Sequence, residues 1–146
     1  MALEITFTPQ VLGETEKALN AILYRELGHV ELTEHQWIVL RLTVIGGGEV
    51  GREQLVGRLA GALKVEAPAA EARVDELVAA GLLQASPDAE RVAVTEAGGR
   101  VHGRVRGAVD EITTRLWGDL PEDDLATTGR TLTTILERAN AQFGTA

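Results

Sequence analysis

The stretch that decides the fold opens with Glu66-Ala67-Pro68-Ala69-Ala70-Glu71 and closes with Leu77-Val78-Ala79-Ala80-Gly81-Leu82-Leu83. Apolar residues recur at helical spacing through it, so it predicts an amphipathic helix. Pro68 suits the first turn, where its missing N–H has no cost, and Gly81 is a typical helix stop. The apolar residues after Gly81 then begin a strand. The stretch therefore predicts a helix that runs directly into a β-hairpin.

The hairpin itself is short. Residues 82–85 and 91–94 alternate as strands do, and the segment between them, Ser86-Pro87-Asp88-Ala89-Glu90, has the Pro and Asp of a turn. We expect a two-stranded wing that follows the helix.

The same periodicity predicts five further helices. Thr33 and Gln36 form a capping box at the start of one of them, and the run Gly46-Gly47-Gly48 ends it in a turn. The five expected helices are Pro9 to Leu27, Thr33 to the glycine run, Arg52 to Leu63, Thr95 to about Leu116, and one that begins around Leu120-Pro121-Glu122. The order is four helices, a wing and two helices.

Composition limits the class of protein. With 146 residues, of which 45% are hydrophobic, the chain suits a single folded domain. No apolar run reaches the ~18 residues of a membrane span, and the N-terminus does not resemble a signal peptide. Cysteine is absent, which excludes disulfides and thiolate metal sites. We expect a soluble cytoplasmic protein with no membrane association and no cofactor.

The charge balance is acidic. The whole chain has a net charge of −8, and residues 51–100 contain six basic against eight acidic side chains, a net charge of −2. DNA-binding modules usually show a basic surface, because neutralisation of phosphates supplies much of their affinity. An acidic module of this kind predicts weak non-specific binding to DNA.

The predicted architecture is mainly α-helical with a small β-wing. We assign residues 1–146 to one domain, with a winged helix-turn-helix over 32–95. Residues 9–28 and 100–143 carry more apolar surface than one small module can cover, so they are interpreted mainly as dimerisation helices.

The chain resembles the multiple antibiotic resistance regulator (MarR) family of bacterial transcription factors. The resemblance rests on four segments, which are residues 32–40, 55–60, 74–83 and 95–98, followed by the long helix and residues 120–125. It implies an obligate homodimer, a palindromic DNA operator and relief of repression by small molecules, often phenolic. The chain departs from the family in a shorter wing, in which Arg91 is the only base, and in acids at the start of the recognition helix.

Four arginines are the candidate contacts to double-stranded DNA: Arg52, Arg58, Arg73 and Arg91. Arg73 is the single base of the predicted recognition helix, from where it could reach a base edge or a phosphate. It could equally pair with a nearby acid such as Glu66 or Glu76. Arg52 and Arg58 lie on the preceding helix, where phosphate contacts are common, and an ordinary surface role is the alternative.

The resemblance also implies an effector cavity between the dimerisation helices and the winged domain. The candidate residues for a small aromatic effector are Tyr24, His35, Trp37 and Arg41. Trp37 has a plain core position as its alternative. The three histidines lack the spacing of a metal site, so no metal is predicted.

No catalytic motif is present, so we do not predict an enzyme. The sequence favours a dimeric, ligand-responsive transcriptional regulator that binds operator DNA. The main alternative is a protein of the same fold that has lost DNA binding and acts as a small-molecule binder or protein partner. An enzyme that uses the dimer cavity is a weaker third hypothesis, without a sequence feature in its favour.

Overall fold

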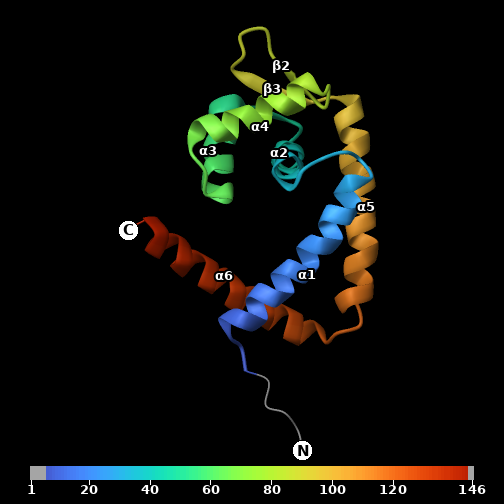
Figure 1. Cartoon of the computed structure of the whole chain (residues 1–146), viewed down its shortest axis with the longest axis vertical. Helices are drawn as coiled ribbons and strands as arrows, with labels where there is room; N and C mark the ends of the chain where they lie inside the picture. Colours follow the sequence, from blue (N-terminus) through green and yellow to red (C-terminus); the bar gives the residue numbers. More distant parts are fainter. Residues whose placement is uncertain (1–5, 145–146) are drawn as a thin grey trace, which may run out of the picture. The chain divides into compact units, whose positions relative to one another are not determined.

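The computed structural model describes residues 6–144, which form six helices and three strands (Figure 1). The elements are α1 Pro9–Gly28, α2 Glu34–Ile45, β1 Glu49–Gly51, α3 Arg52–Leu63, α4 Ala67–Ala79, β2 Leu83–Ala85, β3 Arg91–Val94, α5 Glu96–Trp117 and α6 Glu122–Gly144. All six predicted helices are present. The mainly α-helical fold with a small β-wing is confirmed.

The chain divides into two compact units, one that ends at Val109 and one that starts at Asp110, so the boundary falls within α5. The first unit contains α1 to α4, the sheet and the first half of α5. The second contains the end of α5 and all of α6. The assignment of residues 1–146 to a single domain stays a prediction.

Local signals explain where the helices begin and end. The capping box of α2 is confirmed, since Thr33 Oγ1 accepts from Gln36 N at 3.2 Å and Gln36 Oε1 accepts from Thr33 N at 3.1 Å. Gly81 follows α4 with φ +78, a left-handed conformation that favours glycine. Thr95 caps α5 by accepting from Gly98 N at 3.0 Å.

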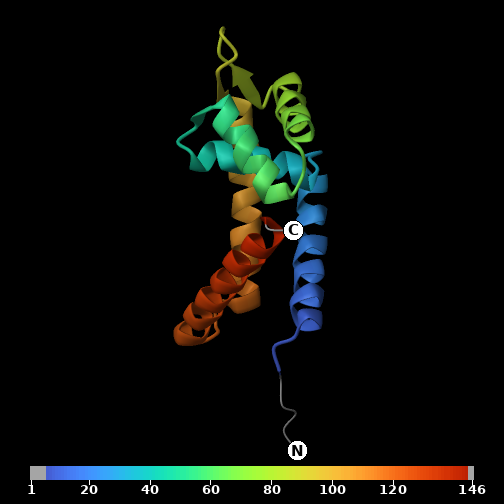
Figure 2. The ribbon, with the colours of Figure 1, turned by 90° about the vertical axis from the view of Figure 1, so that its left-hand side faces the viewer.

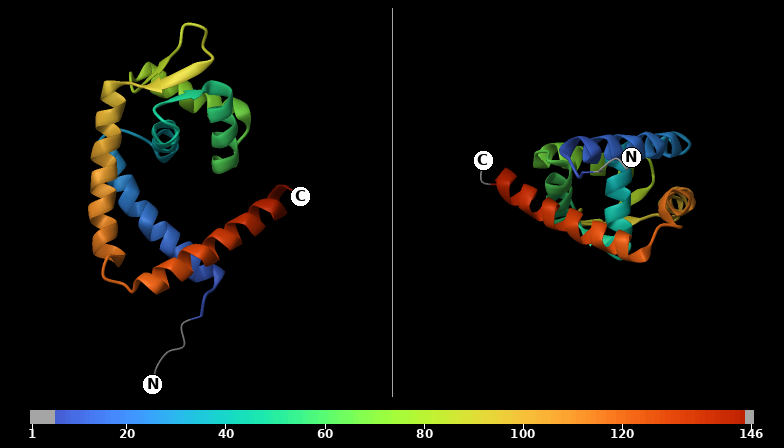
Figure 3. Two further views of the ribbon diagram at one scale, coloured as in Figure 1. Left: turned by 180° about the vertical axis from the view of Figure 1, so that it is seen from behind. Right: turned by 90° about the horizontal axis from the view of Figure 1, so that it is seen from below.

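The prediction of a two-stranded wing is wrong in one respect, because the sheet that contains β2 and β3 has a third strand, β1. The antiparallel order is β1-β3-β2, with Val50 and Ala85 opposite Val92 on the central strand. Gly47 and Gly48, both at positive φ, turn the chain after α2 so that β1 pairs with β3. The glycine run is therefore the entry to a strand (Figure 3).

One hydrophobic core holds the first unit together. Its largest fully buried side chains are Leu27, Val39, Leu40, Leu59, Val74, Leu77, Leu83, Val92 and Val105. They come from α1, α2, α3, α4, the wing strands and α5, so the core joins the helix-turn-helix to the helices on either side of it. Figures 1 and 2 show α3 and α4 next to each other, with the turn between β2 and β3 beyond them.

The second unit contrasts with the first, because α6 contains no buried residue. Two of its apolar side chains are well exposed, Leu136 at 59% and Phe143 at 64%. In α1 of the first unit Val11, Leu12 and Leu19 are exposed as well. No helix in the described part of the chain is both long and apolar enough to cross a membrane.

Candidate functional site

The centre of the candidate site is the pair α3 and α4. Lys64 adopts a left-handed conformation between them, and Val65 N donates to Ala60 O at 3.1 Å, which closes a tight turn. Ala70, Val74 and Leu77 bury the inner face of α4. The opposite face of α4 is thereby held toward solvent, as in a helix that inserts into a DNA groove.

That outer face carries acids and alanines. Glu71 and Asp75 are exposed, as are Ala69 and Ala79. The single base of α4, Arg73, is only partly exposed and lies three residues after buried Ala70 and four before buried Leu77. The charge on the outer face is therefore negative.

Arg52, at the start of α3, is paired with this outer face. Its Nη2 lies 2.6 Å from Asp75 Oδ1, and its side chain is 20% exposed while that of Asp75 is 67% exposed. Its backbone N also donates to Glu90 O at 2.8 Å. Arg52 therefore joins α3 to α4 and to the wing, with its charge balanced by Asp75.

Arg73 is held by a chain of polar contacts that leads to α2. Its Nη2 lies 3.0 Å from Glu76 Oε1, so the predicted alternative of an ion pair with Glu76 is confirmed. Glu76 Oε2 accepts from Gln36 Nε2 at 2.9 Å, and Gln36 is the capping residue of α2. Arg73 Nε is buried and has no hydrogen-bond partner among the described residues. A guanidinium that is ion-paired and has a buried Nε is less available to base edges in this conformation.

The wing contributes Arg91, which pairs with Glu49 of β1 at 3.1 Å. Both side chains are about half exposed, at 52% and 57%. The tip of the wing is ordered by Asp88, whose Oδ1 accepts from Ser86 Oγ at 2.5 Å and from Glu90 N at 3.0 Å. The Ser86 hydroxyl lowers the pKa of Asp88 below its usual range. The tip is therefore negative, and the wing arginine lies behind it.

A pocket of about 670 Å³ opens where these parts meet. Its lining comes from the start of α3, the start of α4 and the end of the wing turn, and it includes Arg52, Glu53, Gln54, Glu71, Glu90 and Arg91. The structure thus brings two of the four candidate arginines, Arg52 and Arg91, to one concave surface, and their role as DNA contacts stays a prediction. It also places Glu71 and Glu90 there.

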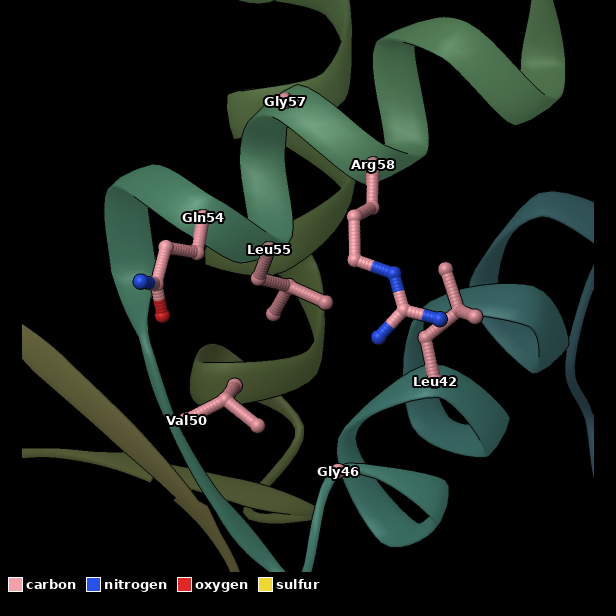
Figure 4. A pocket seen from close by; sticks show the side chains of 7 residues that line it. All are labelled: Leu42, Gly46, Val50, Gln54, Leu55, Gly57 and Arg58. Carbon is pink, nitrogen blue, oxygen red and sulfur yellow. The ribbon is translucent and has the colours of Figure 1, made fainter.

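Arg58 does not line the pocket that contains Arg52 and Arg91. It lines a separate pocket of about 590 Å³ with residues of α2, β1 and α3 (Figure 4). The two pockets share Gln54 in their linings. Arg58 is exposed and has no ion pair within residues 6–144.

In the expected effector region, the prediction that Trp37 is a core residue is confirmed by its 6% exposure. Its ring stacks on His102 of α5, with centroids 5.3 Å apart and an angle of 20° between the planes. Burial lowers the pKa of His102, and the positive charges of Arg106 and Arg41 lower it further. The neutral imidazole is therefore favoured beside Trp37.

Tyr24 and His35 lie elsewhere on the same unit. Tyr24 Oη donates to Glu34 Oε2 at 2.7 Å, and this hydrogen bond raises the pKa of the tyrosine. Tyr24 lines a pocket of about 320 Å³ with Glu34 and with residues of α1. His35 is half-buried at the start of α2. The role of these four residues in effector binding stays a prediction.

Three contacts of the candidate site residues were not predicted from the sequence: the ion pair of Arg91 with Glu49, the hydrogen bond from Gln36 to Glu76, and the stacking of Trp37 on His102. Gln36 was identified only as a cap, since a capping box is visible in sequence while a contact to α4 is not. His102 directly follows Val101, which belongs to the apolar stripe of the long helix, and this position at the edge of the stripe is the sequence signal for its contact with the core. Within the described residues no cluster of three or more potential ligands could hold a metal ion.

The fold of this chain is similar to that of solved structures of transcriptional regulators. A MarR family transcriptional regulator from Silicibacter pomeroyi matches with a TM-score of 0.73 and 24% identity, covering 92% of this chain and 90% of its own. A mutant MarR from E. coli complexed with operator DNA gives 0.67 and 20%, covering 87% and 91%. NadR in complex with 4-hydroxyphenylacetate gives 0.70 and 18%, covering 92% and 97%. No protein-family model and no curated protein sequence matches the chain. By its structure, this chain has the winged-helix fold of the MarR-family transcriptional regulators.

Proposed function

We propose that this protein is a dimeric transcriptional regulator that binds operator DNA through α4 and the wing and responds to a small aromatic effector. The observation that carries the proposal is the concave surface of about 670 Å³ at the start of α4. It unites the helix-turn-helix, the wing and two arginines, Arg52 and Arg91. A neighbour of the same fold is complexed with operator DNA.

The ion pairs of this surface predict how it binds. Arg52 and Arg91 each have a carboxylate within 3.1 Å, so a phosphate must replace Asp75 or Glu49 as the partner. Exchange of one exposed ion pair for another yields little free energy. Specific contacts must then supply most of the affinity, and non-specific binding should be weak with a shallow dependence on salt.

The test is a mobility-shift titration on DNA from upstream of the protein's own gene, repeated at several salt concentrations. Arg52→Gln and Arg91→Gln should each weaken binding and make the salt dependence shallower, by less than the one unit of an unpaired phosphate contact, because each arginine gives up a carboxylate when it binds phosphate. Arg100→Gln is the matched control, since Arg100 also forms an ion pair, with Glu96 at 3.3 Å, but lies on α5. Equal losses in all three variants would contradict the proposed surface.

The homodimer is supported by apolar surface that the monomer leaves exposed. In α6 no residue is buried, and Leu136 and Phe143 of this helix are 59% and 64% exposed, while Leu120 just before it is 49% exposed. Exposed apolar surface of this extent favours association with a second copy. We expect a two-fold dimer with an interface above ~2,000 Å². A particle of monomer mass in light scattering at micromolar concentration would oppose this part of the proposal.

The effector is proposed to bind near Tyr24, His35, Trp37 and Arg41. Arg41 and the Tyr24 hydroxyl offer polar contacts, and Trp37 lies in the core on the same helix as Arg41, where its fluorescence can report binding. The neighbour NadR is complexed with a hydroxylated aromatic acid. Titration with 4-hydroxyphenylacetate should change the fluorescence of Trp37, and Trp37→Phe should remove that change. If Trp117→Phe removes it instead, the assigned location is wrong.

A second candidate function is a protein of this fold that does not bind DNA. The outer face of α4 favours it, because Glu71 and Asp75 are exposed there and Arg73 is turned inward to Glu76. The same titration separates the two candidates. No shift of the wild type on any upstream DNA at low salt, together with a shift of Glu71→Arg, would support the second candidate.

A further inference from the structure

The pocket that contains Arg58 has an apolar floor. It lies in the first unit between the end of α2, strand β1 and the first half of α3, and its volume is about 590 Å³ (Figure 4). Leu42, Val50 and Leu55 provide aliphatic surface, and two of these, Leu42 and Leu55, belong to the buried core. A rigid apolar floor of this kind binds the apolar part of a ligand.

Polar groups stand on the walls of the pocket. Figure 4 shows the Arg58 side chain extending from α3 toward Leu42, while Gln54 occupies the opposite wall. Neither the Arg58 guanidinium nor the Gln54 amide has an ion pair or side-chain hydrogen bond within residues 6–144. Arg58 differs in this from Arg52, Arg73 and Arg91, each of which has a carboxylate partner.

Gly46 lies against the floor of the pocket. A Cβ at Gly46 would lie 2.5 Å from Val50 Cγ1 and would displace the floor.

We propose that this pocket binds a small aliphatic monocarboxylate. Its lining contains one cation, one amide and aliphatic side chains, without an acidic or an aromatic residue. The carboxylate would accept charge-assisted hydrogen bonds from Arg58, and its chain would cover Leu42, Val50 and Leu55. The site is distinct from the DNA-facing pocket, with which it shares Gln54.

The test uses the full chain and octanoate as the probe, with no DNA present. Calorimetric titration should show saturable binding, and the backbone amide signals of Gly46 and Gly57 should shift in nitrogen–proton correlation spectra. Octanol, which has the same chain without the charge, should bind at least about tenfold more weakly, as expected when a charge-assisted contact is lost. Arg58→Gln should weaken octanoate binding by a similar factor.

Arg104→Gln on α5, an exposed arginine away from the pocket, is the control for charge and should bind octanoate as the wild type does. Absence of saturable binding, equal binding of octanol, or unchanged binding by Arg58→Gln would overturn the proposal.

Discussion

Replacing Asp75 by asparagine removes the carboxylate that balances Arg52 on the outer face of α4. The two side chains are joined by a contact of 2.6 Å, and Asp75 is the more exposed partner at 67%. Asparagine keeps the size of the side chain, so the helix and its packing should be preserved. The substitution therefore frees one guanidinium at the edge of the proposed DNA surface and removes one negative charge from it.

The expected effects differ in size. An exposed ion pair contributes ~0.2–1 kcal/mol to stability, so the variant should remain folded with a loss near the lower end of that range. One additional phosphate contact changes the slope of log affinity against log salt by about −0.9. Over a fourfold rise in salt, from about 50 to about 200 mM, the variant should then lose about 3.5-fold more affinity than the wild type. At the lower salt it should bind DNA more tightly.

The assay is a fluorescence-anisotropy titration with labelled duplex DNA at four salt concentrations. Glu96→Gln is the matched control, since it makes the same change in net charge and frees Arg100, which lies on α5 and not on the helix-turn-helix. A steeper slope in Asp75→Asn than in Glu96→Gln supports the surface assigned here. An equal slope in the two variants would show that net charge alone acts, and the assignment of Arg52 to the DNA surface would be refuted.

Three further outcomes are expected. The pKa of His102 is lowered in the folded state, so below about pH 6.5 the unfolded chain binds more protons than the folded chain. The free energy of unfolding, measured in urea, should therefore decrease as the pH falls through this range. The decrease should be smaller in His102→Gln. Gly98→Ala should lose ~1–3 kcal/mol of stability in the same assay, because its Cβ would lie 2.1 Å from the backbone carbonyl oxygen of Leu82. Gly99→Ala is the control and should keep its stability, because a Cβ there meets nothing within 4 Å. Equal losses in the two variants would refute the steric reason. Leu136→Glu should reduce the dimer fraction in sedimentation equilibrium, while Ile45→Glu, a comparably exposed apolar position at 61%, should leave it unchanged; a persistent dimer in Leu136→Glu would exclude α6 from the interface.

The helices could be predicted because their signals are local. Thr33 with Gln36, Pro68 and Gly81 each act within one helical turn, and the structure uses each as predicted. Strand β1 was missed for the opposite reason. It has three residues and exists only through its pairing with β3, where Val50 lies opposite Val92. Periodicity cannot identify a strand of that length.

The candidate arginines were predictable as residues, whereas their partners were not. Arg52 meets a carboxylate 23 positions later in the chain, and Arg91 meets one 42 positions earlier. Contacts at such separations depend on the tertiary fold. The acidity of the region was visible in the sequence and predicted weak DNA binding, but the inward orientation of Arg73 required the structure.

Gln36 shows how one residue can join a local and a long-range role. Its side-chain oxygen accepts from the backbone of Thr33, which fixes the start of α2, and its nitrogen donates to Glu76 of α4, 40 positions away. Glu76 in turn holds Arg73. Both ends of the same amide are thus occupied, so displacement of the first turn of α2 would also disturb the carboxylate that holds Arg73. Glu34 lies in that same first turn of α2 and accepts the hydrogen bond from the Tyr24 hydroxyl of α1. Residues 34–36 therefore connect the contact between α1 and α2 with Arg73, the single basic residue of α4.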